Sequence, residues 1–292
     1  MVVWAANFVV VKDVLGSMPP VGFTFLRYSL AAVTLIAILR VSREPMRLPR
    51  DELVPILVLG GLGFGLYQIL WTVGLVSIPA GDSALIIAAT PVFTAVIAVL
   101  LGTDTLTPRK AIGVVSSFLG VVLVIAAGIG IELSGSPVGF ALTFGATLCW
   151  ATYTAFGARV LRRQSPLVLT TWATVGGVIV LAPLGVLQLA APGAVDVSDG
   201  GALAVVLAIV YSGVLAAAVA NVVVFRGVQL LGPTHITTIQ ALVPAFAVVL
   251  AFLFLGEPIR PVQVIGGAII IAGVALTRTA SRGRAVRPEA ST

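Results

Sequence analysis

Charged residues are scarce in this sequence. They make up 10% of its 292 residues, whereas 59% of the residues are hydrophobic. A water-soluble domain needs about a quarter of its residues charged to cover its surface. The scarcity therefore excludes a soluble globular protein, and most of the molecular surface must face lipid. For the same reason the net charge of +6 is not a nucleic-acid signal, and only its distribution between loops is informative.

Cysteine and histidine are nearly absent, with one of each. Cys149 cannot form an intrachain disulfide and lacks partners for a metal site. No Asp or Glu lies clearly inside an apolar run, and no glycine-rich phosphate loop precedes a soluble helix. We therefore expect no metal, no cofactor and no ATP-driven pump. An enzyme is also not expected, because the sequence offers no catalytic constellation.

Long apolar blocks are what the sequence has in abundance. A helix needs about 20 mostly apolar residues to cross the hydrocarbon core, and the blocks lack the alternation of barrel strands. The sequence therefore predicts an all-α integral membrane protein with ten transmembrane helices. The blocks are 1–15, 20–39, 53–77, 81–101, 109–129, 138–158, 166–190, 202–225, 233–255 and 262–278.

The loop charges predict the orientation. If the loop after the second block is cytoplasmic and the sides alternate, only Lys12 and Arg260 lie in outer loops, and Arg27 lies inside a span. All other Lys and Arg residues are then cytoplasmic, which is a strong positive-inside bias. We predict a multi-pass protein of the cell (inner) membrane with both termini cytoplasmic and a basic tail over residues 279–292.

The two halves of the chain resemble each other. A shift of 153 residues aligns Gly74 with Gly227, Pro91 with Pro244, Phe93 with Phe246, Asp104 with Glu257, Pro108 with Pro261, Gly113 with Gly266 and Gly120 with Gly273. Earlier in each half, a shift of 146 aligns Trp4 with Trp150, Pro20 with Pro166 and Thr24 with Thr170. The predicted repeats are residues 1–129 and 137–278. Each has five spans, an odd number, so the second must cross the membrane inverted, as in many secondary transporters.

The first block is too short to span the membrane. From Met1 to Lys12 a helix rises only about 17 Å, against about 30 Å of hydrocarbon. The matching block of the second repeat has more apolar residues before Trp150 than the first has before Trp4. We expect about ten further apolar residues upstream of Met1, which would complete a full span.

Several segments resemble one known family. They are Trp4-Ala5-Ala6-Asn7-Phe8 with Lys12, Pro19-Pro20, Leu26-Arg27, Thr90-Pro91, and above all Leu255-Gly256-Glu257-Pro258 before the Gly266 to Gly273 stretch. The chain resembles two tandem EamA domains of the drug/metabolite transporter superfamily. The first copy departs from the pattern, reading Thr103-Asp104 where Gly-Glu is usual. The resemblance implies ten spans, cytoplasmic ends and transport of small metabolites, often export.

Two carboxamides occupy matching positions inside spans, since Gln68 and Asn221 are repeat mates. Polar side chains in lipid-embedded helices usually face the bundle interior, so both could flank one central cavity. The alternative is hydrogen bonding that only holds helices together.

An aromatic lining is the second candidate feature. Trp4 and Asn7 share a helical face, Trp150 and Tyr153 repeat this pattern, and Trp71 lies three residues after Gln68. Such a lining suits amphipathic organic solutes. Ordinary packing or an interfacial aromatic belt would give the same pattern.

Two prolines interrupt spans at matching positions. Pro91 frees the carbonyl of Ile87, and Pro244 frees that of Gln240. These sites are predicted hinges, with Gln240 a candidate ligand contact, unless the kinks are static. Arg27 could contact an anionic substrate group, snorkel to the outer surface or pair with a carbonyl. Glu257 and its mate Asp104 are predicted helix-boundary acids rather than proton carriers.

We predict a secondary transporter of small organic metabolites, such as amino acids or related compounds. It would export them by alternating access between two inverted repeats. The alternative function is a polytopic membrane enzyme acting on lipid-linked substrates. A small-molecule substrate and the lipid bilayer are the predicted partners, and the sequence does not determine the oligomeric state.

Overall fold

The computed structural model describes residues 1–127, 135–161, 163–195, 201–224, 240 and 242–285, the last eight by their backbone only. Every regular element in these ranges is a helix. The first half holds α1 (Val2–Val14), α2 (Pro20–Val41), α3 (Arg50–Gly60), η1 (Gly61–Leu66), α4 (Tyr67–Val76), α5 (Ala80–Ala88), α6 (Thr90–Leu100) and α7 (Pro108–Ala126). The second half holds α8 (Pro137–Val160), α9 (Pro166–Leu189), α10 (Gly201–Val210), η4 (Tyr211–Val219), α13 (Val243–Leu255) and α14 (Pro261–Ala285).

Helices lie in each of the predicted apolar blocks. Among the described residues, six helical segments are long and apolar enough to cross a membrane, and Val243–Leu255 and Pro261–Thr277 are shorter apolar helices. The six are Pro20–Val41, Arg50–Val76, Ala80–Leu100, Pro108–Ala126, Pro166–Leu189 and Gly201–Val224. α14 continues to Ala285, so it includes the first residues of the segment predicted as a basic tail.

Local sequence explains where the helices begin and end. α2, α7, α8 and α9 each begin at a proline, whose fixed φ and missing N–H suit the first helical turn. α13 ends at Gly256, which has φ 67° and so adopts the left-handed conformation that favours glycine. These signals were readable in the sequence, and the helix boundaries follow them closely.

The helices run between two ends of the bundle that differ in charge. At one end, here named the basic end, α2 and α8 finish near Arg40 and Arg159 and α7 begins beside Arg109. At the other, here named the Glu257 end, α13 finishes and α5 begins.

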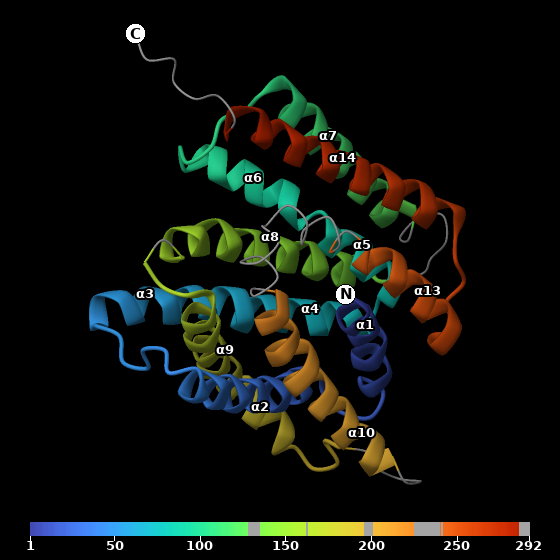
Figure 1. The fold of residues 1–292 in the computed structure, drawn as a ribbon. Coiled ribbons are helices and arrows are strands. Elements are labelled where there is room, and N and C mark those ends of the chain that lie inside the picture. The colour runs from blue at the N-terminus through green and yellow to red at the C-terminus, as the bar shows by residue number, and fades with distance from the viewer. Residues whose placement is uncertain (128–134, 162, 196–200, 225–239, 241, 286–292) are drawn as a thin grey trace.

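Glycine allows α7 and α14 to pack closely along one edge of the bundle (Figure 1). A Cβ on Gly113 would lie 2.6 Å from the carbonyl oxygen of Gly273, and one on Gly120 would lie 2.9 Å from that of Gly266. Neither contact leaves room for a side chain. The partner order is reversed along the two helices, so they are antiparallel. The bundle's opposite edge is formed by α2 packed on α9.

Two π-helical segments were not predicted from the sequence. η1 interrupts the α3–α4 span and η4 follows α10. The 153-residue shift maps residues 61–66 onto 214–219, which lie within η4, so the two segments occupy matching positions in the two halves. π-helical turns are rare and occur frequently at functional sites. Gln68 and Asn221 each follow such a segment by two residues.

The predicted interruption at Pro91 is present. α5 ends at Ala88 and α6 begins at Thr90, with Ala89 between them. The carbonyl of Ile87, which Pro91 cannot satisfy, accepts a hydrogen bond of 2.6 Å from Thr90 Oγ1. At the matching position in the second half, Pro244 is the second residue of α13, and residue 241 lies outside the described residues.

Candidate functional site

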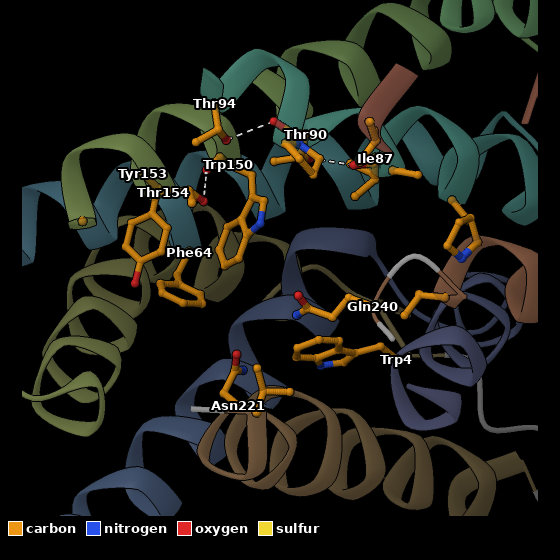
Figure 2. A pocket seen from close by; sticks show the side chains of 18 of the residues that line it. Trp4, Phe64, Ile87, Thr90, Thr94, Trp150, Tyr153, Thr154, Asn221 and Gln240 are labelled. Carbon is orange, nitrogen blue, oxygen red and sulfur yellow. Dashed lines mark hydrogen bonds between the residues drawn. The ribbon is translucent and has the colours of Figure 1, made fainter. Parts of the chain in front are cut away.

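A cavity of about 520 Å³ opens in the centre of the bundle (Figure 2). Its lining extends to the basic end at Leu161, which directly follows α8 and is 40% exposed. Its described lining consists of Trp4, Phe8, Phe64, Ala84, Ile87, Ala88, Thr90, Pro91, Thr94, Trp150, Tyr153, Thr154, Gly157, Leu161, Leu169, Asn221, Val224, Gln240, Val243, Pro244, Ile271 and Val274. The volume falls within the range of small-molecule sites.

Aromatic rings from two helices form one wall of this cavity. Trp150 and Tyr153, one turn apart on α8, stack with centroids 5.0 Å apart. Phe64 of η1 meets both edge-on, at 5.4 Å and 5.1 Å. Such offset and T-shaped contacts hold rings in fixed orientations. The wall therefore presents a preformed apolar surface to a ligand.

Uncharged polar groups complete the lining. Asn221 donates through Nδ2 to the carbonyl of Ala217 at 2.8 Å, and Gln240 also lines the cavity (Figure 2). Thr94 Oγ1 donates to the carbonyl of Thr90 at 3.0 Å. None of the described lining residues is acidic or basic. The cavity thus suits a solute with a large apolar part and a few hydrogen-bonding groups.

The structure brings together seven of the residues singled out from the sequence. They are Trp4, Pro91, Trp150, Tyr153, Asn221, Gln240 and Pro244. Trp4 is held by its indole N–H, which donates to the carbonyl of Ala216 in η4 at 2.9 Å. Asn7, Gln68, Trp71 and Arg27 do not line this cavity. Asn7 Oδ1 accepts from Ser212 Oγ at 2.5 Å, and Trp71 donates to Ser83 Oγ at 3.0 Å.

Arg27 and Gln68 belong to a buried polar cluster. Arg27 is 1% exposed and donates to Gln68 Oε1 at 2.5 Å. Gln68 in turn donates to Tyr28 Oη at 2.6 Å. The guanidinium carbon lies 5.0–5.5 Å from the ring centroids of Phe23, Tyr28 and Trp71, within the range of cation–π attraction. Burial this complete means that Arg27 does not snorkel to the surface.

Glu257 closes the end of the bundle that is named after it. Its carboxylate accepts hydrogen bonds from the backbone N–H groups of Ala80 at 2.7 Å and Gly81 at 3.1 Å. These are the first N–H groups of α5, where a negative charge is favoured by the helix dipole. Glu257 therefore sits at a helix start, as predicted, but the helix begins 177 residues earlier in the chain.

Two neighbouring groups strengthen this closure. Asp82 pairs with Arg260 at 2.6 Å and accepts from Gln263 at 2.7 Å, which joins α5 to α14. Lys12 Nζ donates to carbonyls at the end of α4 and just beyond it, those of Leu75, Val76 and Ile78, at 2.6–3.0 Å. At this end α4 thus meets α1, and α5 meets α14, through charge-assisted hydrogen bonds.

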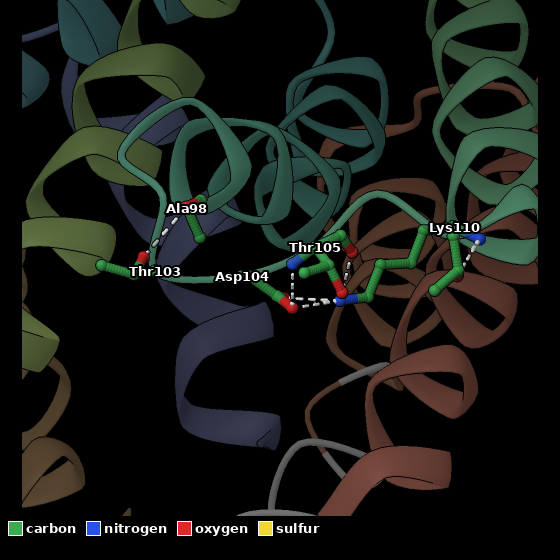
Figure 3. Close-up of polar contacts among 6 residues, drawn as sticks. Ala98, Thr103, Asp104, Thr105 and Lys110 are labelled. Carbon is green, nitrogen blue, oxygen red and sulfur yellow. Dashed lines mark hydrogen bonds and ion pairs between the residues drawn. The ribbon is translucent and has the colours of Figure 1, made fainter.

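Asp104, the repeat mate of Glu257, has different partners at the basic end (Figure 3). It pairs with Lys110 in the first turn of α7 at 2.5 Å and accepts from the N–H of Thr105 at 2.7 Å. Lys110 also donates to the carbonyl of Thr105 at 3.2 Å. These contacts are local, within six residues of Asp104. Asp104 thus stabilises its own loop and the start of α7.

The sequence reasoning missed several lining residues. Thr90 and Thr94 lie one turn apart beside Pro91, and that spacing was a usable signal because both hydroxyls fall on one helical face. Phe64 gave no signal, since an aromatic residue among glycines and leucines in an apolar block looks like ordinary packing.

Comparisons with known proteins agree with this architecture. The model of the EamA-like transporter family matches residues 1–126 and 137–279. A probable terminal-alkyne amino-acid exporter of Streptantibioticus cattleyicolor is 30% identical, with 100% of this chain and 94% of that protein covered. A probable amino-acid metabolite efflux pump of Salmonella typhimurium is 28% identical over 94% of this chain and 90% of that protein.

The fold has also been observed in a crystal structure. One solved protein superposes with a TM-score of 0.64 at 18% identity, over 96% of this chain and 94% of that one. The family and the named relatives are transporters, so the alternative of a membrane enzyme is set aside. This chain belongs to the EamA-like transporter family and is a multi-pass membrane transporter.

Proposed function

We propose that this protein is a secondary exporter of small organic metabolites, namely amino acids or closely related compounds. It works by alternating access between two inverted five-helix repeats, residues 1–129 and 137–278, with ten spans in the inner membrane. The basic end and both termini face the cytoplasm, and the tail over residues 279–292 lies at the inner surface. The observation that carries this proposal is a central cavity that extends to the basic end, while contacts of Glu257 and Asp82 join helices at the other end.

Loading from the cytoplasm follows from this orientation. Arg40, Arg109 and Arg159 lie at the end towards which the cavity extends, and the positive-inside rule assigns such residues to the cytoplasm. The structure is then an inward-facing state, in which an exporter takes up its solute. Release requires the Glu257 end to separate, which means breaking the contacts of Glu257 and Asp82.

Packing and local helix geometry support the inverted repeats. Gly113 and Gly120 of α7 meet Gly273 and Gly266 of α14. The 153-residue shift maps each of these contacts onto the other, as a two-fold axis between the repeats requires. η1 and η4 also fall on matching positions.

The amide pair supports alternating access. Asn221 lines the open cavity, whereas its mate Gln68 is 5% exposed and bonded to Arg27 and Tyr28. If the two repeats exchange conformations, Gln68 becomes accessible from the Glu257 end as Asn221 becomes buried. The two matching amides thus occupy different environments, and exchanging these environments would convert one state of the transport cycle into the other.

The substrate class follows from the lining and from the relatives. Trp4, Trp150 and Tyr153 provide an apolar surface, and Asn221 and Gln240 provide donors and acceptors without net charge. The names of the two relatives given above describe exporters of amino-acid compounds. We assign these five residues to solute binding in the inward-facing state, and Pro91 and Pro244 to the hinges.

The test is solute flux from proteoliposomes. Purified protein is reconstituted and preloaded with each of the radiolabelled amino acids in turn, and saturable efflux is compared with that from protein-free liposomes. Asn221→Ala and Gln240→Ala are measured beside Gly145→Ala, whose new methyl group meets only Leu70 at 3.5 Å. We expect flux of at least one amino acid, lowered in the two amide variants and unchanged in the control. Flux equal to that of protein-free liposomes for every solute would refute the proposal.

A further inference from the structure

Arg27 carries a buried positive charge for which the described part of the chain supplies no carboxylate. It is 1% exposed, and its Nε has no hydrogen-bond partner among the described residues. Within the described part of the chain, its guanidinium contacts one amide oxygen, of Gln68, and three aromatic rings. An arginine at this depth is ordinarily paired with an acid, because a lone buried charge is costly.

The described acids are committed elsewhere or lie at the ends of the bundle. Glu257 and Asp82 hold the Glu257 end together, and Asp104 pairs with Lys110. At the basic end, Glu52 accepts from Gln164 and Glu44 accepts from Ser165. Asp13 is exposed at the end of α1, and Asp51 lies in the first turn of α3. The balancing anion must therefore come from outside these residues.

Contacts of the Arg27 cluster reach both the cavity wall and α5. It lies seven residues into α2 from the Glu257 end, behind the aromatic wall of the cavity. Its neighbour Trp71 stacks with Tyr67, and Tyr67 contacts Trp150 of that wall at 5.3 Å. Trp71 also donates to Ser83 of α5, the helix that Glu257 holds in the closed state. The cluster therefore connects the wall of the cavity to the helix that Glu257 caps.

The position that matches Arg27 in the second half carries no charge. The 146-residue shift maps Arg27 onto Ala173, a buried alanine of α9. The cavity at the basic end accordingly has no charged lining in the described residues, while the cluster beneath the Glu257 end has a guanidinium. A solute would meet neutral groups first and a cation only on its way out.

We infer that Arg27 binds the carboxylate of the transported solute when the Glu257 end opens, with Gln68 released to bind the same solute. This rests on the proposed export function and narrows its substrate class to compounds that combine one free carboxylate with an apolar body. The guanidinium offers paired N–H donors that match a carboxylate in geometry, which neither the amides nor the rings can do. The aromatic wall binds the apolar body before the transfer.

The test compares acids with their amides in reconstituted protein. The probes are L-leucine, L-phenylalanine and their C-terminal amides, which keep the side chain and lose the carboxylate. Wild type should carry the preferred acid at least about 10-fold faster than its amide, because a site that loses an intended partner discriminates strongly. Arg27→Gln should lower the rate for the acid about 10-fold or more and leave the amide within about twofold. Arg40→Gln, an exposed arginine on the same helix, is the matched control and should behave as wild type.

Three outcomes separate the hypotheses. If Arg27→Gln carries the acid as fast as wild type, or wild type does not distinguish acid from amide, the assignment of Arg27 is overturned and the export function stands. If wild type carries no amino acid at all, the export function itself fails. If Arg27→Gln does not yield folded protein, the same comparison of acid and amide is made with Arg27→Lys. A loss confined to the acid supports the inference, and equal loss for acid and amide overturns it.

Discussion

Replacing Glu257 by glutamine should open the end of the bundle that this residue closes. The carboxylate accepts from two N–H groups at the start of α5, at 2.7 Å and 3.1 Å. A glutamine keeps one acceptor oxygen, presents an NH₂ group where the second oxygen was, and removes the charge that the helix dipole favours. Hydrogen bonds to charged groups contribute about 1.5–3 kcal/mol each. We therefore expect the closed state to lose about 2 kcal/mol, which corresponds to about a 30-fold shift towards the open state.

The shift can be measured as the accessibility of one buried cysteine. Ser83 is fully buried behind the closed end, and Cys149 is the native thiol to be removed by Cys149→Ser. In the Cys149→Ser, Ser83→Cys background, a membrane-impermeant thiol reagent is applied from the outer side of reconstituted vesicles. Glu257→Gln should raise the labelling rate about 30-fold, in proportion to the open population.

The matched control is the same substitution at the opposite end. Glu52→Gln removes a carboxylate that accepts from Gln164 at the basic end and should leave the labelling of Ser83→Cys unchanged. An unchanged rate in Glu257→Gln would refute the role given to its carboxylate. Equal increases in both variants would show general loosening of the fold instead.

Two other predictions concern the cavity and the packing. Asn221→Ala should lower amino-acid efflux at least about fivefold at an unchanged melting temperature, because about 1 kcal/mol of hydrogen bonding to the solute is lost. A lower melting temperature with unchanged flux per folded molecule would show that Asn221 has a structural role instead. Gly113→Ala should destabilise the fold by about 1–3 kcal/mol, because its methyl group would lie 2.6 Å from the carbonyl of Gly273. A melting temperature equal to that of Gly145→Ala would contradict the close α7–α14 packing.

The family and the helical segments could be predicted from sequence because both depend on local patterns. Apolar length indicates membrane helices, and proline and glycine mark their ends, as at Pro108 and Gly256. The recurrence of residues after 153 positions indicated an internal repeat without reference to contacts. The predicted interruption at Pro91 followed from its missing N–H alone.

Contacts between distant residues could not be predicted in this way. Glu257 was correctly placed at a helix start, but the chain gives no local sign that the helix is α5 rather than α14. Gln68 and Asn221 were recognised as mates, yet only Asn221 lines the cavity. A sequence repeat shows which residues match between the two halves. In a single conformation, however, matching residues can have different surroundings. The π-helical segments have no simple sequence signature either.

The central claim is that the two ends of the bundle open in turn. The most direct measurement joins the Glu257 end covalently and then follows flux. Asp82 and Gln263 meet there at 2.7 Å, so Asp82→Cys and Gln263→Cys in a Cys149→Ser background can be linked by a short bifunctional thiol reagent. With a reagent that forms reducible disulfide links, efflux should stop when the link forms and return on reduction, while the reagent leaves the flux of each single-cysteine variant at that variant's own untreated value. Undiminished efflux through fully linked protein would contradict alternating access.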